Sequence, residues 1–230
     1  MDIAIPILIV NFKTYAEATG LNALNLSSAI KRASEEIEAN VAIAPQFADI
    51  YRVSSETNLP VLAQHVDAIG FGSHTGHILP ESVKEAGAIG SLVNHSERKL
   101  KISEIAKIVN KLRELDMISV VCADDVEVAR AVAALNPDFV AVEPPELIGT
   151  GIPVSKAKPE VVRNTVEEVK KINPEVKVLC GAGITNRDDV VKALELGTDG
   201  VLLASGLVKA KDPYSKAKEL LEGLKEVCKR

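Results

Sequence analysis

The 230-residue chain contains no tryptophan, only 3% aromatic residues and three cysteines. Cys122, Cys180 and Cys228 lie far apart and form no CxxC pattern. Their odd number and their spacing argue against a disulfide framework and against a structural zinc site. The sequence therefore indicates a reducing compartment, and we expect a cytoplasmic protein.

Long hydrophobic runs and basic clusters are also missing. The first apolar run, Ile3 to Val10, has no basic leader and is too short for a membrane span, so we expect no targeting segment and no membrane partner. The formal net charge is −5, the isoelectric point is near 5.5, and no basic stripe is present. These features argue against nucleic acid as a main partner, so an anionic ligand would have to be bound locally.

No Gly/Ser/Pro-rich stretch and no block of charge divides the chain into halves. Apolar residues make up 47% of the sequence, which is enough to bury a large core. We therefore expect a single domain that spans residues 1–230 rather than two small domains.

Eight short apolar runs recur at fairly even intervals. They are Ile5–Val10, Val41–Ala44, Val61–Ala63, Ile89–Val93, Ile118–Cys122, Phe139–Val142, Val176–Cys180 and Val201–Ala204. Their connections are long enough for right-handed crossovers, which predicts an α/β fold built as a single (β/α)8 barrel. The connection between the fifth and sixth runs is tight, so we expect a compact barrel with some shortened helices. A doubly wound open sheet is the alternative.

Three helix starts can be read between these runs. Ser103 precedes an apolar stripe with helical spacing and is a candidate cap. Asp212 and Pro213 form a cap followed by proline at the first helical position. Thr185 and Asp188 resemble a third start.

Polar and ionisable side chains follow several of the predicted strands. The first run ends in Asn11 and Lys13, the fourth in His95 and Glu97, and the sixth in Glu143. A barrel brings the carboxyl ends of all its strands to one rim, where active sites of such enzymes lie. Each residue alone is more often an ordinary solvated or structural group, but their coincidence at one rim favours a catalytic site.

The segment after the sixth run combines an acid with a stiff loop. Glu143 lies where the strand runs out of the sheet, and Pro144 and Pro145 prevent the strand from continuing. Glycines close the loop at 149 and 151. Taken alone, this segment is about equally compatible with two interpretations of Glu143: a solvated glutamate before a turn, or a base beneath a lid.

The last two runs end in segments rich in small residues. Gly181 to Gly183 follow the seventh run, and Ala204, Ser205 and Gly206 follow the eighth. Small side chains allow backbone amides to approach an anion, so the pair predicts a phosphate site. Two ordinary tight turns are the alternative.

Four motifs, in this order, resemble the triosephosphate isomerase family: NFK at 11–13, SLVNHSER at 91–98, AVEPPELIGTG at 141–151 and CGAG at 180–183. They span nearly the whole chain, whose shortness resembles the archaeal branch. The resemblance implies the isomerisation of dihydroxyacetone phosphate to glyceraldehyde 3-phosphate through an enediolate, without a cofactor.

The resemblance also implies residue roles. Glu143 would be the base, His95 a neutral electrophile and Lys13 the positive charge beside the enediolate and the phosphate. Because Ser96 to Arg98 look like a helix start, we expect the helix dipole to keep His95 neutral.

Supporting roles follow from the same likeness. Asn11 would position the substrate, Glu97 would pair with Lys13, and Ser96 would contact Glu143 while the lid is open.

The predicted lid runs from Pro144 to Thr150, with Gly151 at its far hinge. Its closure would place the backbone of Ile148 and Gly149 against the phosphate, together with the amides of Gly183, Ala204 and Ser205. Three positions depart from the family pattern: Glu146 replaces the lid tryptophan, Gly183 a serine, and Ala204-Ser205 the usual glycine pair.

His74 and His77 form an HxxH pattern with His65 upstream, but the segment is broken by glycines and lacks a fourth ligand, so we expect no metal site. The resemblance implies that the segment from Ser73 to His77 inserts into a second subunit. A homodimer is then the minimum, and a homotetramer built from two dimers is expected of the archaeal branch.

Two other functions remain compatible with parts of the sequence. Another phosphate-binding barrel enzyme would share the two glycine-rich segments but would not explain NHSER. A catalytically silent barrel that binds phosphosugars or partners would not need Lys13, His95 and Glu143.

Overall fold

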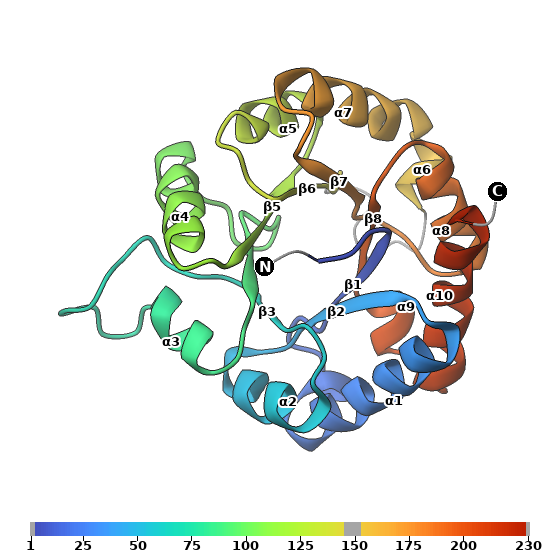
Figure 1. Cartoon of the computed structure of the whole chain (residues 1–230), viewed down its shortest axis with the longest axis horizontal. Coiled ribbons are helices and arrows are strands. Elements are labelled where there is room, and N and C mark those ends of the chain that lie inside the picture. The colour runs from blue at the N-terminus through green and yellow to red at the C-terminus, as the bar shows by residue number, and fades with distance from the viewer. Residues whose placement is uncertain (1–2, 145–152, 229–230) are drawn as a thin grey trace.

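A computed structural model describes residues 3–144 and 153–228 and shows a ring of parallel strands surrounded by helices (Figure 1). The strands are β1 (Ile7–Asn11), β2 (Asn40–Ala44), β3 (Leu62–Ala63), β4 (Gly90–Val93), β5 (Ile118–Ala123), β6 (Phe139–Val142), β7 (Lys177–Cys180) and β8 (Gly200–Leu203). All eight predicted runs form strands.

The sheet closes nearly into a barrel. Its strand order is β2-β1-β8-β7-β6-β5-β4-β3, and β2 meets the start of β3 through a parallel bridge between Ile43 and Val61. Each strand therefore neighbours the strands next to it in sequence. This order confirms the (β/α)8 barrel and excludes the doubly wound open sheet.

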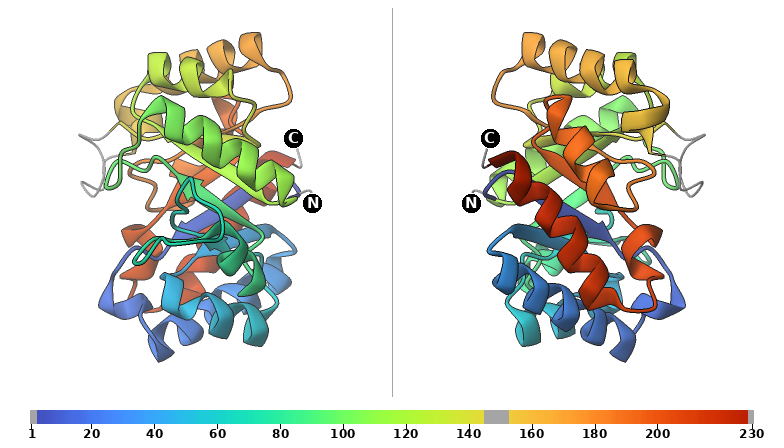
Figure 2. Two further views of the ribbon diagram at one scale, coloured as in Figure 1. Left: turned by 90° about the vertical axis from the view of Figure 1, so that its left-hand side faces the viewer. Right: turned by 90° about the vertical axis from the view of Figure 1, so that its right-hand side faces the viewer.

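Helices cover the outside of the barrel. They are α1 (Leu21–Ile37), α2 (Ile50–Thr57), α3 (Pro80–Glu85), α4 (Ile102–Glu114), α5 (Val126–Ala133), α6 (Val154–Ala157), α7 (Pro159–Ile172), α8 (Arg187–Glu195), α9 (Ser205–Val208) and α10 (Pro213–Cys228), with short 3-10 helices η1 (Ala16–Ala18) and η2 (Phe47–Asp49). As expected of a compact barrel, several are short, and α6 and α9 have four residues each. Side views show that β1 begins and α10 ends on the same side of the molecule (Figure 2). None of the described helices could cross a membrane.

The predicted helix starts are partly correct. Asp212 accepts a hydrogen bond from the Ser215 backbone at 3.2 Å, which confirms the start of α10. The start of α8 lies one residue later than predicted, since Asn186 is the cap and Asp189, not Asp188, completes the capping box. Ser103 is not a cap: the Lys101 backbone N–H donates to Glu104 at 3.0 Å, so the helix begins before the serine.

Side chains of the barrel strands alternate between two cores. In β1, Ile7 and Ile9 belong to the cluster inside the barrel, whereas Leu8 and Val10 pack in the larger cluster between the strands and the helices. Both clusters are almost fully buried, as expected of strands covered on both faces. This alternation decides which residues at the strand ends point into the barrel mouth.

Candidate active site

Because side chains alternate between the two faces of each strand, several residues at the strand ends point into the mouth of the barrel. Glu143 continues the inward series after Ala141, Asn11 does so after Ile9, and Gly181 after Leu179. A pocket opens at this rim. Its lining residues are Asn11, Lys13, Tyr15, His95, Glu143, Gly181 to Thr185 and Leu202 to Gly206. The structure therefore brings the predicted base, imidazole and amine together with both small-residue segments.

Glu143 is deeply buried, with 3% of its surface exposed. Its backbone N–H donates to the Ala123 carbonyl at 2.8 Å, and its Oε2 receives no hydrogen bond from the residues that the structure describes. Burial raises the pKa of Glu143 to about 7, although the Cys122 thiol and the Lys13 charge act in the opposite direction. A carboxylate with such a pKa can take and return a proton near neutral pH.

Two neighbours shape the surroundings of this carboxylate. A Cβ atom on Gly181 would lie 2.3 Å from Cγ of Glu143, so the glutamate fits only beside glycine. The second neighbour is Cys122 of β5, whose buried thiol hydrogen-bonds the Glu143 carboxylate. Burial raises the pKa of this thiol well above its usual value. Sequence reasoning missed Cys122, although Cys122 pairs in register with Ala141 and points inward after Val120.

His95 lies beside Glu143, with 3.7 Å between Nε2 of His95 and Oε2 of Glu143. The prediction of a helix start at this position is wrong. Residues 96–98 form a turn in which the Arg98 N–H donates to the His95 carbonyl at 2.7 Å. Burial, reinforced by the charge of Lys13, instead lowers the pKa of His95 to about 4. The ring is therefore neutral near pH 7 because it is desolvated and lies near a cation.

A backbone hydrogen bond also sets the tautomer of this ring. The Glu97 N–H donates to Nδ1 of His95 at 3.1 Å, so Nδ1 acts as an acceptor and the proton resides on Nε2. Asn94 holds the same turn, because its amide donates to the Cys122 carbonyl at 2.9 Å and accepts from the Leu100 N–H at 3.0 Å. The turn thus presents an N–H donor to the pocket.

Lys13 is fixed at both its backbone and its ammonium group. Its backbone has a φ of 47°, and its N–H donates to the Asn11 side chain at 2.9 Å. Its Nζ lies 3.0 Å from Oε1 of Glu97. Gln64 donates to the Lys13 carbonyl at 2.9 Å and to the Ala44 carbonyl at 3.0 Å. Sequence reasoning missed Gln64, which inward alternation after Leu62 could have indicated.

The two small-residue segments line the same pocket. Gly183 has a φ of 73°, a conformation that favours glycine, and lies between β7 and α8. Ala204 and Ser205 lie where β8 passes into α9. These three predicted anion-binding positions therefore lie on the same pocket as Lys13.

Other predicted positions lie elsewhere or are not described. The lid segment beyond Pro144, including Glu146, Ile148, Gly149 and Gly151, lies outside the described residues. Within the described part, no hydrogen bond joins Ser96 to Glu143.

The histidines of the HxxH region do not converge on the pocket. His65 is buried and its Nε2 lies 3.0 Å from Oδ1 of Asp67. His74 and His77 are exposed, with their ring centres 6.0 Å apart. They belong to the segment between β3 and α3, which extends away from the barrel (Figure 1).

Comparisons with known proteins agree with this arrangement. The family model for triosephosphate isomerase matches residues 6–222. The triosephosphate isomerase of Methanothermus fervidus is 60% identical over 216 residues, which cover 94% of this chain and 97% of that protein. The triosephosphate isomerase of Methanobacterium bryantii is 57% identical over 208 residues, which cover 90% and 92% respectively.

A solved structure shares the fold. The crystal structure of triosephosphate isomerase from Bartonella henselae has a TM-score of 0.73 and covers 99% of this chain and 100% of that chain. At 18% identity, this likeness concerns the fold alone. The match of the family model and the identity to the methanogen proteins decide the relationship: the chain belongs to the triosephosphate isomerase family, in its archaeal type.

Proposed function

We propose that Glu143 carries the reaction of this family, the interconversion of dihydroxyacetone phosphate and glyceraldehyde 3-phosphate in glycolysis and gluconeogenesis. The carboxylate removes a proton from the hydroxymethyl carbon of dihydroxyacetone phosphate, which leaves an enediolate. It then returns the proton to the neighbouring carbon, which yields the aldehyde. The observation that supports this role best is a buried carboxylate with a pKa of about 7, one oxygen of which receives no hydrogen bond from the described residues.

His95 acts on the substrate oxygens in this proposal. Its Nε2–H donates to the carbonyl oxygen, on which negative charge develops as the carbon loses its proton. A neutral imidazole is a better matched acid for an enediolate than an imidazolium, because the proton can be passed between the two oxygens and returned. The lowered pKa of His95, about 4, supports this role.

Lys13 supplies positive charge to the enediolate and the phosphate. Glu97 holds the ammonium group, Asn11 positions the substrate together with the Lys13 backbone, and Ser96 contacts Glu143 in the open state. The contacts of Lys13 with Asn11 and Glu97 support the roles of these two residues.

The phosphate is bound by backbone amides in this proposal. Gly183, Ala204 and Ser205 supply them on the barrel side, and Ile148 and Gly149 supply them from the lid. Because Gly183 has no side chain, phosphate affinity at that position rests on the amide alone. No cofactor and no metal takes part.

A coupled assay of triose phosphate interconversion tests the proposal. We expect rapid turnover without added cofactor and a loss of at least about a thousandfold in kcat for Glu143→Gln, since the amide cannot accept the proton. Glu81→Gln is the matched control, because Glu81 also has a buried oxygen without a hydrogen-bond partner among the described residues and lies away from the pocket. Full activity of Glu143→Gln would refute the assigned base.

The assembly and setting complete the proposal. Residues 1–230 form one barrel domain that works in the cytoplasm. The segment from Ser73 to His77 joins two copies, and two such dimers form a homotetramer, with the homodimer as the smaller alternative. Exposed Phe71 and Tyr51, 80% and 70% exposed, line one surface groove beside this segment and support an interface there.

A further inference from the structure

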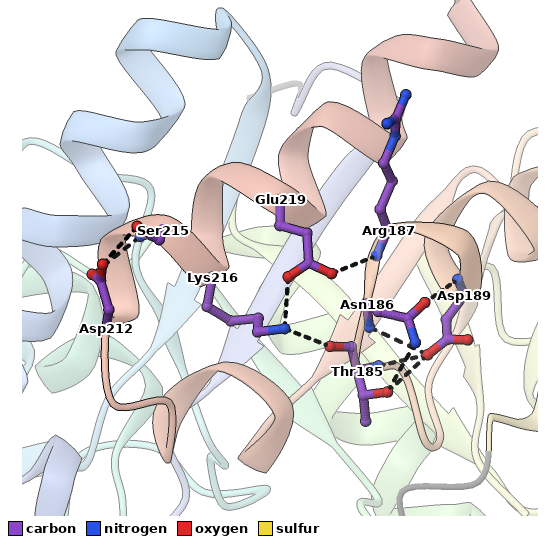
Figure 3. Close-up of polar contacts among 8 residues, drawn as sticks. All are labelled: Thr185, Asn186, Arg187, Asp189, Asp212, Ser215, Lys216 and Glu219. Carbon is purple, nitrogen blue, oxygen red and sulfur yellow. Dashed lines mark hydrogen bonds and ion pairs between the residues drawn. The ribbon is translucent and has the colours of Figure 1, made fainter.

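Asp189 is a buried carboxylate that the proposed reaction does not use. It lies in the first turn of α8 and is 0% exposed. Its Oδ2 accepts the Thr185 N–H at 2.9 Å, the Thr185 hydroxyl at 2.9 Å and the Asn186 N–H at 3.3 Å (Figure 3). A single oxygen thus holds the end of the segment that begins at Gly181 and lines the pocket.

Thr185 is held from its other side by α10. Its carbonyl accepts a hydrogen bond from Nζ of Lys216 at 3.2 Å, and Lys216 also donates to Glu219 at 2.7 Å (Figure 3). The second oxygen of Glu219 accepts the Arg187 N–H at 3.3 Å. The N–H, the hydroxyl and the carbonyl of Thr185 are therefore all engaged, which leaves this residue little freedom to turn.

The other oxygen of Asp189 faces a cation from α6. Nζ of Lys156 lies 2.5 Å from Oδ1, which receives no aligned hydrogen bond from the described residues. The pair therefore depends on charge. A buried carboxylate near an anion site would oppose the anion unless a cation balanced it.

We propose that Asp189 and Lys156 are positioning residues for the phosphate group of the substrate. Asp189 fixes Thr185 and thereby the course of the backbone from Gly181 to Gly183, whose amides meet the phosphate. Lys156 balances the buried charge, so that the carboxylate holds the segment without repelling the dianion. This inference rests on the proposed function, because it assigns the same pocket to a phosphate monoester.

Two variants and a control test the inference. Asp189→Asn keeps the size of the side chain but removes its charge, and Lys156→Met removes only the balancing cation. Lys192→Met is the matched control, because Lys192 also lies on the surface and pairs with Glu195 of the same helix at 3.7 Å. Circular dichroism checks that each variant is folded. If Asp189→Asn does not fold, the half-exposed Lys156 still decides the outcome.

The readout separates phosphate binding from chemistry. For both variants we expect inorganic phosphate to bind about tenfold more weakly, as measured by calorimetry. The KM for glyceraldehyde 3-phosphate should rise about tenfold. Both changes have the size expected when one charge-assisted contact is lost. Turnover of unphosphorylated glyceraldehyde should stay within about twofold of wild type, and Lys192→Met should change nothing. Unchanged phosphate binding in folded variants, or a parallel loss with glyceraldehyde, would overturn the inference.

The calorimetric arm also separates this inference from the proposed function. If the wild-type protein turns over no triose phosphate, the proposed function fails. Loss of phosphate binding in Lys156→Met would still support the positioning role, and its retention would still contradict it.

Discussion

At the scale of single residues, Glu143 and His95 owe their protonation states to burial. The raised pKa of Glu143 and the lowered pKa of His95 both favour the uncharged forms of the two side chains. As the pH rises through about 7, Glu143 loses its proton while His95 is already neutral. Above that pH the carboxylate is ionised, as the proposed base requires.

The pH dependence of kcat/KM follows from this pair. We expect kcat/KM to fall about tenfold per pH unit below about pH 7, because protonated Glu143 cannot act as a base. Cys122→Ala should move this midpoint to higher pH, since the thiol's hydrogen bond lowers the pKa of Glu143. Steady-state kinetics from pH 5 to 9 measure both midpoints, and a midpoint near 4.5 in the wild type would contradict the desolvated carboxylate.

The same shift has a consequence for stability. Folded Glu143 has a pKa of about 7 and the unfolded chain about 4.5, so the folded state binds this proton more tightly. Its contribution to stability is fully present below about pH 4.5 and is lost as the pH rises through about 7. Between pH 4 and pH 8, the wild-type protein should therefore lose about 3 kcal/mol more of its free energy of unfolding than Glu143→Gln, which has no proton to lose at this position. Urea unfolding at both pH values measures the shift, and parallel pH profiles would exclude it.

Gly181 gives a steric prediction at the same site. In Gly181→Ala, the new Cβ would lie 2.3 Å from Cγ of Glu143 and force the glutamate to move. A displacement of this size costs about a hundredfold in kcat, because the base must stay in line with the reacting carbon. Gly70→Ala, where no atom lies within 4 Å of the added Cβ, is the control and should leave kcat unchanged.

Sequence reasoning located these residues better than it explained them. Lys13, His95 and Glu143 could be found because strand ends of a barrel meet at one rim. Neutral His95 was expected from a helix dipole, whereas burial and Lys13 lower its pKa. Desolvation depends on which distant segments pack over the ring, and no local pattern reports that. Gln64 and Cys122 were missed because their roles require the inward register of β3 and β5.

At the scale of elements, apolar runs predicted the strands well, and caps were harder to place. A strand buried on both faces leaves a strong local signal, whereas a cap depends on one or two hydrogen bonds. Asn186 rather than Thr185 caps α8, and Glu104 satisfies the Lys101 N–H at the start of α4. Several residues near a helix start have side chains that can cap the helix, so composition alone does not identify the one that does.

The capping assignments give a paired prediction. Asn186→Ala removes the acceptor of the Asp189 N–H and should lower the free energy of unfolding by about 1 kcal/mol. Ser103→Ala, at an exposed position inside α4, should change it by less than about 0.5 kcal/mol. Thermal or urea unfolding distinguishes the two, and an equal loss in both variants would restore Ser103 as a cap.

At the scale of the whole molecule, the even spacing of eight runs and the lack of a linker were sufficient to predict a closed barrel. The structure and role of the connections, however, cannot be predicted from the pattern of strands. The segment between β3 and α3 extends from the barrel (Figure 1). Its proposed role in joining two copies of the chain was predicted only from the family resemblance.

Replacement of Phe71 tests the proposed assembly. Phe71→Asp places a charge on an exposed apolar surface and should convert the oligomer to smaller species, since an unpaired charge is costly in an interface. Leu21→Asp, at a residue 70% exposed on α1, is the matched control and should keep the wild-type mass. Sedimentation velocity measures both, and an unchanged mass in Phe71→Asp would exclude this surface from the interface.

The role proposed for Glu143 is the transfer of a carbon-bound proton of a triose phosphate. Its most direct test is the uptake of solvent deuterium by dihydroxyacetone phosphate and glyceraldehyde 3-phosphate in D2O, followed by proton NMR without added cofactor. We predict deuterium at the reacting carbons with the wild-type protein and a rate lower by at least about a thousandfold with Glu143→Gln. Equal deuterium uptake by the two proteins would exclude Glu143 as the base.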